Sequence, residues 1–541
     1  MKWTRRDLLK GLGGLPILGA VWWAGAANTV GARRERNELL EKLNISPSLP
    51  NNLPEITGKP VRVGIIGFGI RGEQLCRSLG FATNEWIEAM ELEAVENPDN
   101  TALKVYRNQA KLNVKLTGVC DIFDVRAEKA LNSFATPDNQ IKRYRTHLDM
   151  VNSGEIDAVI IATPDHWHAP MAIDALNNNV SVYVEKPMTH TVEETYRLQE
   201  AAKNSKATFA VGHQHRQTLS FKTAQDVVEK GTLGHVSLIQ TNTNRNDDNG
   251  AWNYDIHENA NENTIDWEMF LGSAPKVPFN KNHFFRWRKW WAYGSGLSGD
   301  LLTHDYDRLN CVLNMGIPKS IMASGGVYTH NDGRDVPDVL QANMEFPDFS
   351  TGSSQIKGKE KGMTFCYSAT LGNGFNRPTI LMGHDATLEL GNNLTVWPDN
   401  SSTRYAESLE LGKMKPNIPI FKYTPGSNAK MPDAVSSATS QYFADKGLMW
   451  TYIDGVRVDS TFLHLKEWLS VIKNGGNVSC GIKEGFEEAI TAHMTGLSWK
   501  LGRRIEWDKE QQIIKPIEGI NFDEVLLSNG QWTKTSPRLG S

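Results

Sequence analysis

Short hydrophobic runs recur in the first half of the chain, at residues 61–66, 116–120, 158–162 and 180–184. Hydrophobic positions with helical spacing follow the first run, and others separate the third run from the fourth. Strand-length hydrophobic runs that alternate with helical patterns are typical of a parallel sheet covered by helices. The pattern predicts an α/β domain over residues 60–190, with an inserted segment at about residues 81–112.

The second half of the chain has a different pattern. Hydrophobic and polar residues alternate at 342–346, 364–368 and 383–390, which predicts strands of a second sheet. Helical spacing of hydrophobic positions returns over residues 484–501. We therefore expect an α+β domain over residues 191–505, followed by a C-terminal tail at residues 506–541.

The first hydrophobic run leads directly into a glycine-rich turn and then into a helical pattern. In that setting Gly67 makes the tight turn, Gly69 allows backbone amides to approach a pyrophosphate, and Gly72 allows the helix to pack closely. The N-terminus of the helix also favours an anion. The turn therefore predicts a Rossmann domain whose dinucleotide is contacted by Gly67, Phe68, Gly69, Ile70, Arg71 and Gly72.

The second hydrophobic run is followed by Asp121. A carboxylate at this position accepts hydrogen bonds from a ribose diol and repels a 2'-phosphate, so it favours NAD over NADP. Asp121 follows Gly72 at a greater distance than the usual spacing of about 20 residues. We attribute the excess to the insertion at residues 81–112, which reads as a solvated helical segment.

The third and fourth runs also end in polar residues. Ligands of such sheets lie beyond the carboxyl ends of the strands. We therefore expect cofactor contacts from these ends, namely from Thr163, Pro164, His168, Glu185 and Lys186. His166 and His168, on either side of Trp167, are interpreted either as helix-capping residues or as contacts on the nicotinamide side.

An arginine pair, Arg5-Arg6, precedes an uncharged, glycine-rich stretch that ends in small residues near Ala27. This arrangement at residues 1–32 resembles a twin-arginine export signal, and residues 33–59 read as a polar linker arm. The resemblance implies the twin-arginine export machinery as a partner and a periplasmic or exported protein. Retention of the uncleaved segment as a membrane anchor stays open.

Composition excludes several classes of function. With 58 Lys and Arg against 62 Asp and Glu, the formal charge is -4, which disfavours binding to nucleic acid or to an anionic membrane. The 5 cysteines are odd in number and contain no Cys-x-x-Cys pair, and the histidines lack metal-ligand spacing. We therefore predict no disulfide framework and no metal site.

The triplet Glu185-Lys186-Pro187, placed after Thr163-Pro164 and the glycine turn, resembles a motif of the Gfo/Idh/MocA family of oxidoreductases. Residues 211–216, 234–236, 299–304 and 464–468 are also similar to the family, and the resemblance covers about residues 60–505. It implies an N-terminal Rossmann domain and a C-terminal α+β domain with a large open, mainly antiparallel sheet. It further implies a homo-oligomer formed through the exposed sheet face.

The resemblance also implies three catalytic residues. Lys186 would polarise the substrate oxygen, His304 would be the acid/base, and Asp300 would orient the pair and hold the substrate, although the roles of Lys186 and His304 can be exchanged. The positions of Asp300 and His304 at i and i+4 would place both on one helix face. The alternative is a structural ion pair of Lys186 and a buried His304.

Further substrate contacts are expected from two segments. The first contains His213, His215 and Arg216, and the second, residues 284–293, interleaves aromatic and cationic side chains. Such rings stack on sugar faces while guanidinium groups bind hydroxyl or carboxylate oxygens. From it we select Arg286, Trp287 and Trp291. The alternative interpretation is an aromatic core or interface cluster.

These features favour an exported NAD-dependent oxidoreductase that acts on a sugar, polyol or sugar derivative. Little free nicotinamide cofactor is expected outside the cytoplasm, so the cofactor would have to be retained and recycled. Two alternatives stay open: an NAD-dependent glycoside hydrolase that uses transient oxidation and elimination, and a non-catalytic sugar-binding protein on a Rossmann scaffold.

Overall fold

The structure is a computed structural model, and it describes residues 54–530 apart from 99, 138, 352–360, 391–393, 424–449, 454 and 455. The predicted export signal, most of the linker arm and the end of the predicted tail lie outside the described residues. No helix among the described residues combines the length and the hydrophobicity needed to cross a membrane.

The first domain is built on a sheet of six parallel strands in the order β3-β2-β1-β4-β5-β6. Its central strands are mostly hydrophobic and almost entirely buried, with Arg62 as a partly exposed exception, because helices cover both faces. The strands are β1 (Val61–Ile66), β2 (Val114–Cys120), β3 (Lys142–Arg143), β4 (Ala158–Ile161), β5 (Ser181–Val184) and β6 (Phe209–Val211). This is the predicted Rossmann domain.

Helices connect these strands. The helix after the glycine turn is α3 (Ile70–Ser78), and the predicted insertion contains α4 (Asn84–Glu96) and α5 (Ala102–Asn108). The other connections are α6 (Asp124–Phe134), α7 (His147–Val151), α8 (Asp165–Asn177) and α9 (Val192–Asn204).

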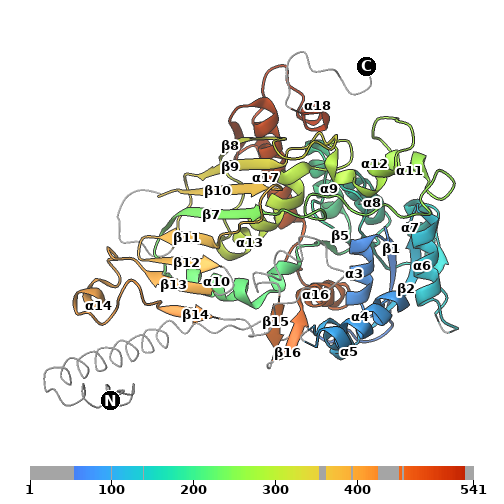
Figure 1. The fold of residues 1–541 in the computed structure, drawn as a ribbon, viewed down its shortest axis with the longest axis horizontal. Coiled ribbons are helices and arrows are strands. Elements are labelled where there is room, and N and C mark those ends of the chain that lie inside the picture. Colours follow the sequence, from blue (N-terminus) through green and yellow to red (C-terminus); the bar gives the residue numbers. More distant parts are fainter. Residues whose placement is uncertain are drawn as a thin grey trace, which may run out of the picture.

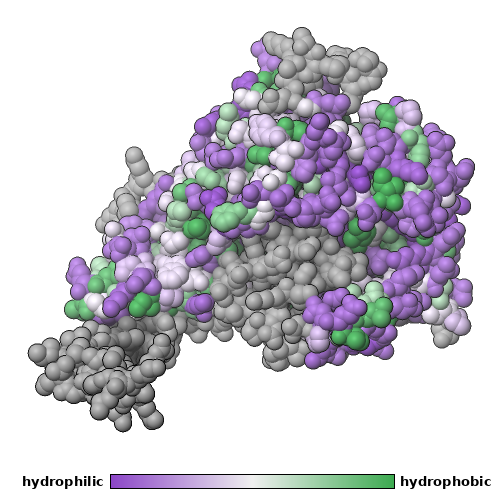
Figure 2. Space-filling view, viewed as in Figure 1, coloured by the Kyte–Doolittle hydropathy of each residue, from purple (hydrophilic) through white to green (hydrophobic). Residues whose placement is uncertain are grey.

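The face shown in Figure 2 is mostly hydrophilic with small separate hydrophobic areas, and the exposed side chains of Leu92 and Val95 lie on α4.

The second domain contains a sheet of ten strands in the order β14-β13-β12-β11-β7-β10-β9-β8-β17-β18. Only the β7–β10 pair is parallel, so the sheet is mainly antiparallel. Its strands are β7 (Val236–Asn244), β8 (Ser320–Gly326), β9 (Val339–Phe346), β10 (Met363–Thr370), β11 (Thr379–Gly383), β12 (Ala386–Leu390), β13 (Leu394–Pro398), β14 (Phe421–Tyr423), β17 (Ile505–Asp508) and β18 (Ile513–Ile514). A separate hairpin pairs β15 (Trp450–Ile453) with β16 (Val456–Asp459).

Helices of the second domain join it to the first. In Figure 1 the large sheet lies on the left and the Rossmann domain on the right, with α17 (Ile482–Leu501) packed on α9 and β8. One continuous hydrophobic cluster contains Val184 and Val211 of the first sheet together with Ala489 of α17. The remaining helices are η1 (Gln214–Gln217), α10 (Leu219–Glu229), α11 (Trp267–Leu271), α12 (Lys281–Phe285), η2 (Trp287–Lys289), η3 (Ser298–Leu302), α13 (Thr303–Leu313), α14 (Ala406–Glu410), α16 (Ser460–Asn474) and α18 (Phe522–Leu527).

Two predicted domain boundaries differ from the structure. The boundary at residue 190 is too early, because α9 and β6 complete the parallel sheet through pairing of β6 with β5. The boundary at residue 505 is also too early, because β17 pairs with β8 and α18 packs against α9 and α17. Both errors lie at strands without a hydrophobic run, since β6 has only three residues and two of the four residues of β17 are acidic.

Candidate functional site

A cavity of about 670 Å³ lies at the carboxyl ends of the parallel strands. One wall comes from the turns that follow β1, β2, β4 and β5, and the opposite wall comes from residues 249–304 of the second domain. Its size is that of a small-molecule or cofactor site. This position at the strand ends is the usual ligand site of an open parallel sheet.

The glycine turn forms one end of this cavity. Gly67 has a φ of +86°, which a residue with a side chain rarely adopts, and a Cβ on Gly72 would lie 2.0 Å from the carbonyl oxygen of Gly67. A Cβ on Gly69 would meet only the Arg126 side chain, at 3.4 Å. Gly67 and Gly72 therefore fit the tight turn, while Gly69 leaves its backbone open to the cavity, as close approach of a pyrophosphate requires.

Asp121 lies beside this turn and is buried. Its two carboxylate oxygens accept hydrogen bonds from the backbone amides of Phe68, at 2.6 Å, and Phe123, at 2.8 Å. Burial raises the pKa of Asp121, although Arg126 and these amides oppose the shift. Each oxygen keeps a second lone pair, so Asp121 can still receive a ribose hydroxyl from the cavity that it lines.

The other predicted cofactor residues divide into two groups. Phe68, Ile70, Thr163, Pro164 and His168 line the cavity. Arg71 and Glu185 also line it, but they pair with each other at 2.7 Å, and Arg71 also donates to Gln74 and Gln214. Among the predicted contacts, Gly72 lies outside the cavity wall, where it supports the turn.

The three predicted catalytic residues meet in the same cavity. The Nζ atom of Lys186 donates to the Asp300 carbonyl oxygen at 2.7 Å and to Asp300 Oδ1 at 2.8 Å. An ammonium group has three hydrogens, so one remains for a substrate oxygen. His304 lines the cavity with them, one helical turn after Asp300, where the short η3 continues into α13.

Asp300 is held by more donors than Lys186 alone. Arg288 Nε donates to its Oδ1 at 3.1 Å, and Trp252 Nε1 donates to its Oδ2 at 3.0 Å. Burial opposes ionisation, but the charges of Lys186 and Arg288 hold the pKa of Asp300 well below its usual range. Asp300 is thus a permanent carboxylate that orients Lys186, and it is unsuited to proton transfer.

The Asp300→Asn variant should therefore unfold more easily. A neutral amide leaves the buried Lys186 and Arg288 cations without their counter-charge, which costs about 3 kcal/mol in the free energy of unfolding. Urea unfolding at neutral pH measures this loss. The control Asp157→Asn removes a half-exposed pair with Arg62 and should cost about 1 kcal/mol or less. An equal loss in both variants would contradict the arrangement.

His304 is suited to the role of base. Burial, together with the positive charge of Lys186, lowers the pKa of His304 well below its usual value. The imidazole is therefore neutral at physiological pH and able to accept a proton. Asp300, which stays ionised, and Lys186, which Asp300 holds in place, are suited to hold and polarise an oxygen.

The lowered pKa of His304 predicts the pH dependence of substrate oxidation. A depressed pKa means that the inactive, protonated His304 forms only below the usual histidine value of 6.5. The kcat/KM for oxidation should therefore stay constant as the pH falls from 8 to about 6, and decline only at more acidic pH. A profile that declines between pH 8 and 7 would contradict a neutral His304.

Five of the predicted substrate contacts do not line this cavity. The His213 side chain contacts the Glu488 carboxylate at 3.0 Å, and Arg216 forms an ion pair with Asp307 at 2.7 Å. His215 is buried beside His304, with 5.6 Å between the ring centroids. Although burial opposes it, the charges of Asp307 and Glu488 raise the pKa of His213. These side chains form a buried polar layer below the cavity, so the prediction of direct substrate contact is not supported.

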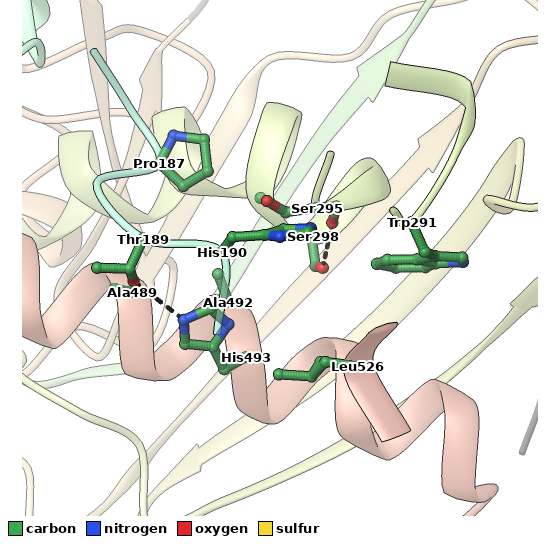
Figure 3. A pocket seen from close by; sticks show the side chains of 11 residues that line it. Pro187, Thr189, His190, Trp291, Ser295, Ser298, Ala489, Ala492, His493 and Leu526 are labelled. Atoms are coloured by element: carbon green, nitrogen blue, oxygen red, sulfur yellow. Dashed lines mark hydrogen bonds between the residues drawn. The ribbon is translucent and has the colours of Figure 1, made fainter. Parts of the chain in front are cut away.

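Arg286 and Trp291 also point elsewhere. Arg286 donates to the carbonyl of Tyr254 at 2.9 Å. Trp291 lines a separate small cavity of about 10 Å³, together with Pro187, Thr189 and His493. Figure 3 shows the hydrogen bond between Thr189 and His493 in this small cavity. Of the three residues selected from segment 284–293, only Trp287 reaches the large cavity.

Several cavity residues gave no signal in the sequence. Arg288 stacks on the Trp287 ring at 4.1 Å, and Tyr254 and Asn249 also line the cavity. Arg126 contributes a further cation near the glycine turn. The alternation of Arg286, Trp287 and Arg288 could have pointed to Arg288, but the loops that hold the others have no motif. Among the described residues, no group of three or more potential ligands is placed to hold a metal ion.

Comparison with known proteins relates the first domain, which forms one wall of this cavity, to a family. Residues 61–213 match the oxidoreductase family with an NAD-binding Rossmann fold, Gfo/Idh/MocA. The inositol 2-dehydrogenase of Salmonella typhimurium is 31% identical over 127 residues, which are 23% of this chain and 37% of that protein. The match thus spans little more than a third of that relative. A glycosyl hydrolase family 109 protein of Shewanella woodyi is 29% identical over 29% of this chain and 30% of its own length.

A longer match is found with levoglucosan dehydrogenase of Pseudarthrobacter phenanthrenivorans, which is 26% identical over 58% of this chain and 72% of its own length. A solved levoglucosan dehydrogenase in complex with NADH and levoglucosan covers 83% of this chain and 99% of its own, with a TM-score of 0.52 and 16% identity. That structure confirms the two-domain fold. Residues 61–213 thus match the Gfo/Idh/MocA family of oxidoreductases, and the likeness to the solved structure extends the shared fold to the second domain.

Proposed function

We propose that the protein is an exported NAD-dependent oxidoreductase that interconverts a hydroxyl and a carbonyl group on a sugar, polyol or sugar derivative and retains its cofactor. One observation carries the proposal: the glycine turn and the Lys186, Asp300 and His304 cluster line one cavity. A dinucleotide bound at the turn, extending past Thr163 and His168, would bring its nicotinamide toward that cluster. Relatives named as inositol 2-dehydrogenase and levoglucosan dehydrogenase support the substrate class.

The residues of the chain divide the chemistry among them. Bound NAD would supply the hydride acceptor. The free hydrogen of Lys186 Nζ would bond the substrate oxygen, and neutral His304 would take the hydroxyl proton during oxidation and return it during reduction. Asp300 would keep Lys186 in place and stay ionised throughout. Arg288 and Trp287 would form the outer wall of the substrate end.

Asp121 supports NAD rather than NADP. Its carboxylate lies at the edge of the cavity where the ribose is expected, and it would repel a 2'-phosphate.

The arginine pair of the predicted signal supports export, and an exported enzyme would need a closed redox cycle with a retained cofactor. We further propose a homo-oligomer through the open sheet, since every second residue of β10 is only half-buried.

Single-turnover experiments test the proposal. Protein loaded with NAD and freed of excess cofactor is mixed with a panel of sugars and polyols, and absorbance near 340 nm is followed. An increase with one substrate, and a product of changed redox state, would support the oxidoreductase. Release of a free sugar from a glycoside without net redox change would favour the hydrolase alternative, and binding without either reaction would favour the sugar-binding protein.

A further inference from the structure

One segment of the second domain crosses to the cofactor side of the Rossmann domain. We call residues 245–296, between β7 and η3, the bridging segment; it contains α11, α12 and η2. Figure 1 shows α11 and α12 beside α7 and α8 of the first domain. This segment supplies most of the cavity wall opposite the glycine turn.

The bridging segment is attached at the end of β2. Phe123 and Ile265 form an antiparallel β-bridge, flanked by hydrogen bonds from Asp124 N to Thr264 O and from Asp266 N to Ile122 O, both 2.9 Å. Phe123 also packs against Phe284 and Phe285 in a buried aromatic cluster. The wall is therefore continuous with the first domain at the end of the cavity beside Asp121.

A second attachment lies at the N-terminus of α8. Trp167 Nε1 donates to the Phe270 carbonyl at 3.0 Å, and Asp165 Oδ2 accepts from Ser295 N at 3.0 Å and from Ser295 Oγ at 2.7 Å. Asp165 is buried. Since both ends of the wall are bonded to the Rossmann domain, the cavity can widen only if one attachment breaks.

Between the two attachments, one cation faces the cavity with unused donors. Arg126 lies 5.6 Å from the ring centroid of Phe284 and 5.4 Å from that of Phe285. All three residues line the cavity, and Arg126 also lies beside Gly69. The Arg126 guanidinium makes no hydrogen bond to any residue that the structure describes. A flat, delocalised cation beside two rings offers a stacking surface for a planar, uncharged base.

We propose that Arg126, Phe284 and Phe285 hold the adenine of the cofactor, and that the doubly attached bridging segment makes exchange of the whole cofactor slower than turnover. This inference rests on the proposed function, because it requires a dinucleotide on the glycine turn. The neighbouring Asp121 carboxylate argues against a 2'-phosphate as the partner of Arg126. The bridging segment would then be the structural basis of cofactor retention.

Exchange kinetics test this proposal. The full-length protein is loaded with NAD and mixed with an excess of isotopically labelled NAD. Samples are desalted at intervals and denatured, and mass spectrometry gives the labelled fraction of the bound cofactor. The half-time of exchange in the wild-type protein should exceed the single-turnover half-time at least tenfold. Exchange as fast as turnover would overturn the retention, while the NAD-dependent reaction itself would still stand.

Two variants and two matched controls locate the effect. Phe285→Ala and Arg126→Ala should each accelerate exchange about tenfold, since each removes one stacking surface from the base. The control for Phe285 is Phe279→Ala, because Phe279 belongs to the same segment but packs against Trp267 outside the cavity. The control for Arg126 is Arg145→Ala, which removes an exposed arginine that pairs with Asp124. Both controls should exchange at the wild-type rate.

Other outcomes would overturn parts of the proposal. Unchanged exchange in both Phe285→Ala and Arg126→Ala would remove these residues from the adenine site. A selective loss of NADP affinity in Arg126→Ala would assign Arg126 to a 2'-phosphate instead. A protein that binds neither NAD nor NADP would refute the proposed function itself, which keeps the two failures distinguishable.

Discussion

The Lys186→Met variant should lose roughly 10³-fold in kcat while it still binds NAD. Lys186 is the one cation in the described cavity that is fixed by two bonds to Asp300 and has a hydrogen left for a substrate oxygen. Methionine preserves much of the side-chain volume but cannot polarise that oxygen. Stopped-flow absorbance near 340 nm on the NAD-loaded protein would measure the loss directly.

A matched variant separates chemistry from general effects of a lost lysine. Lys142→Met removes an exposed lysine that pairs with Glu155 on the surface of the Rossmann domain, so its kcat should equal that of the wild type. Cofactor content must be checked in both proteins. If Lys186→Met turned over at the wild-type rate with its cofactor bound, the assigned role of Lys186 would be wrong and the non-catalytic alternative would gain support.

The Gly69→Ala variant should fold normally but bind NAD roughly 30-fold more weakly, the effect of losing one hydrogen bond to a charged phosphate. Gly69 has an extended backbone, and its added Cβ would meet only the flexible Arg126 side chain. The methyl group would instead occupy the space through which a pyrophosphate approaches the backbone amides. Calorimetric titration with NAD and a thermal unfolding curve would measure the two properties.

Gly72→Ala provides the opposite result from the same turn. Its Cβ would lie 2.0 Å from the backbone oxygen of Gly67, which cannot move without opening the turn, so the melting temperature should fall. Gly374→Ala is the neutral control, because the nearest atom to its added Cβ lies 3.9 Å away. A Gly69→Ala protein with wild-type affinity for NAD would contradict a dinucleotide on this turn.

The sequence predicted those parts of the site that local patterns encode. Gly67 and Asp121 directly follow a hydrophobic strand, and Lys186 is the second residue after one, so the strand fixes where they lie at the sheet edge. The family resemblance added Asp300 and His304, and the structure brings both to the same cavity. The two-domain fold was predicted correctly for the same reason, because most of its strands form a hydrophobic run or an alternating pattern.

The remaining site residues depend on contacts between distant segments. Arg288 reaches the cavity because the bridging segment pairs with residues 122–124, and a single β-bridge has no sequence pattern of its own. Arg286 and Trp291 were selected because their segment interleaves aromatic and cationic side chains, but Arg286 donates to the Tyr254 carbonyl and Trp291 to the Asp335 carbonyl. The short strand β6 was missed because three residues give too little periodicity.

The cofactor content of the native protein is the most direct test of a redox site in this cavity. Protein purified without added cofactor is denatured without acid, and the released material is analysed by mass spectrometry and by absorbance near 340 nm. We expect about one equivalent of NAD or NADH per chain, held in the cavity beside Lys186. A protein that is empty and also fails to bind added NAD or NADP would contradict the assignment of this cavity as a redox site.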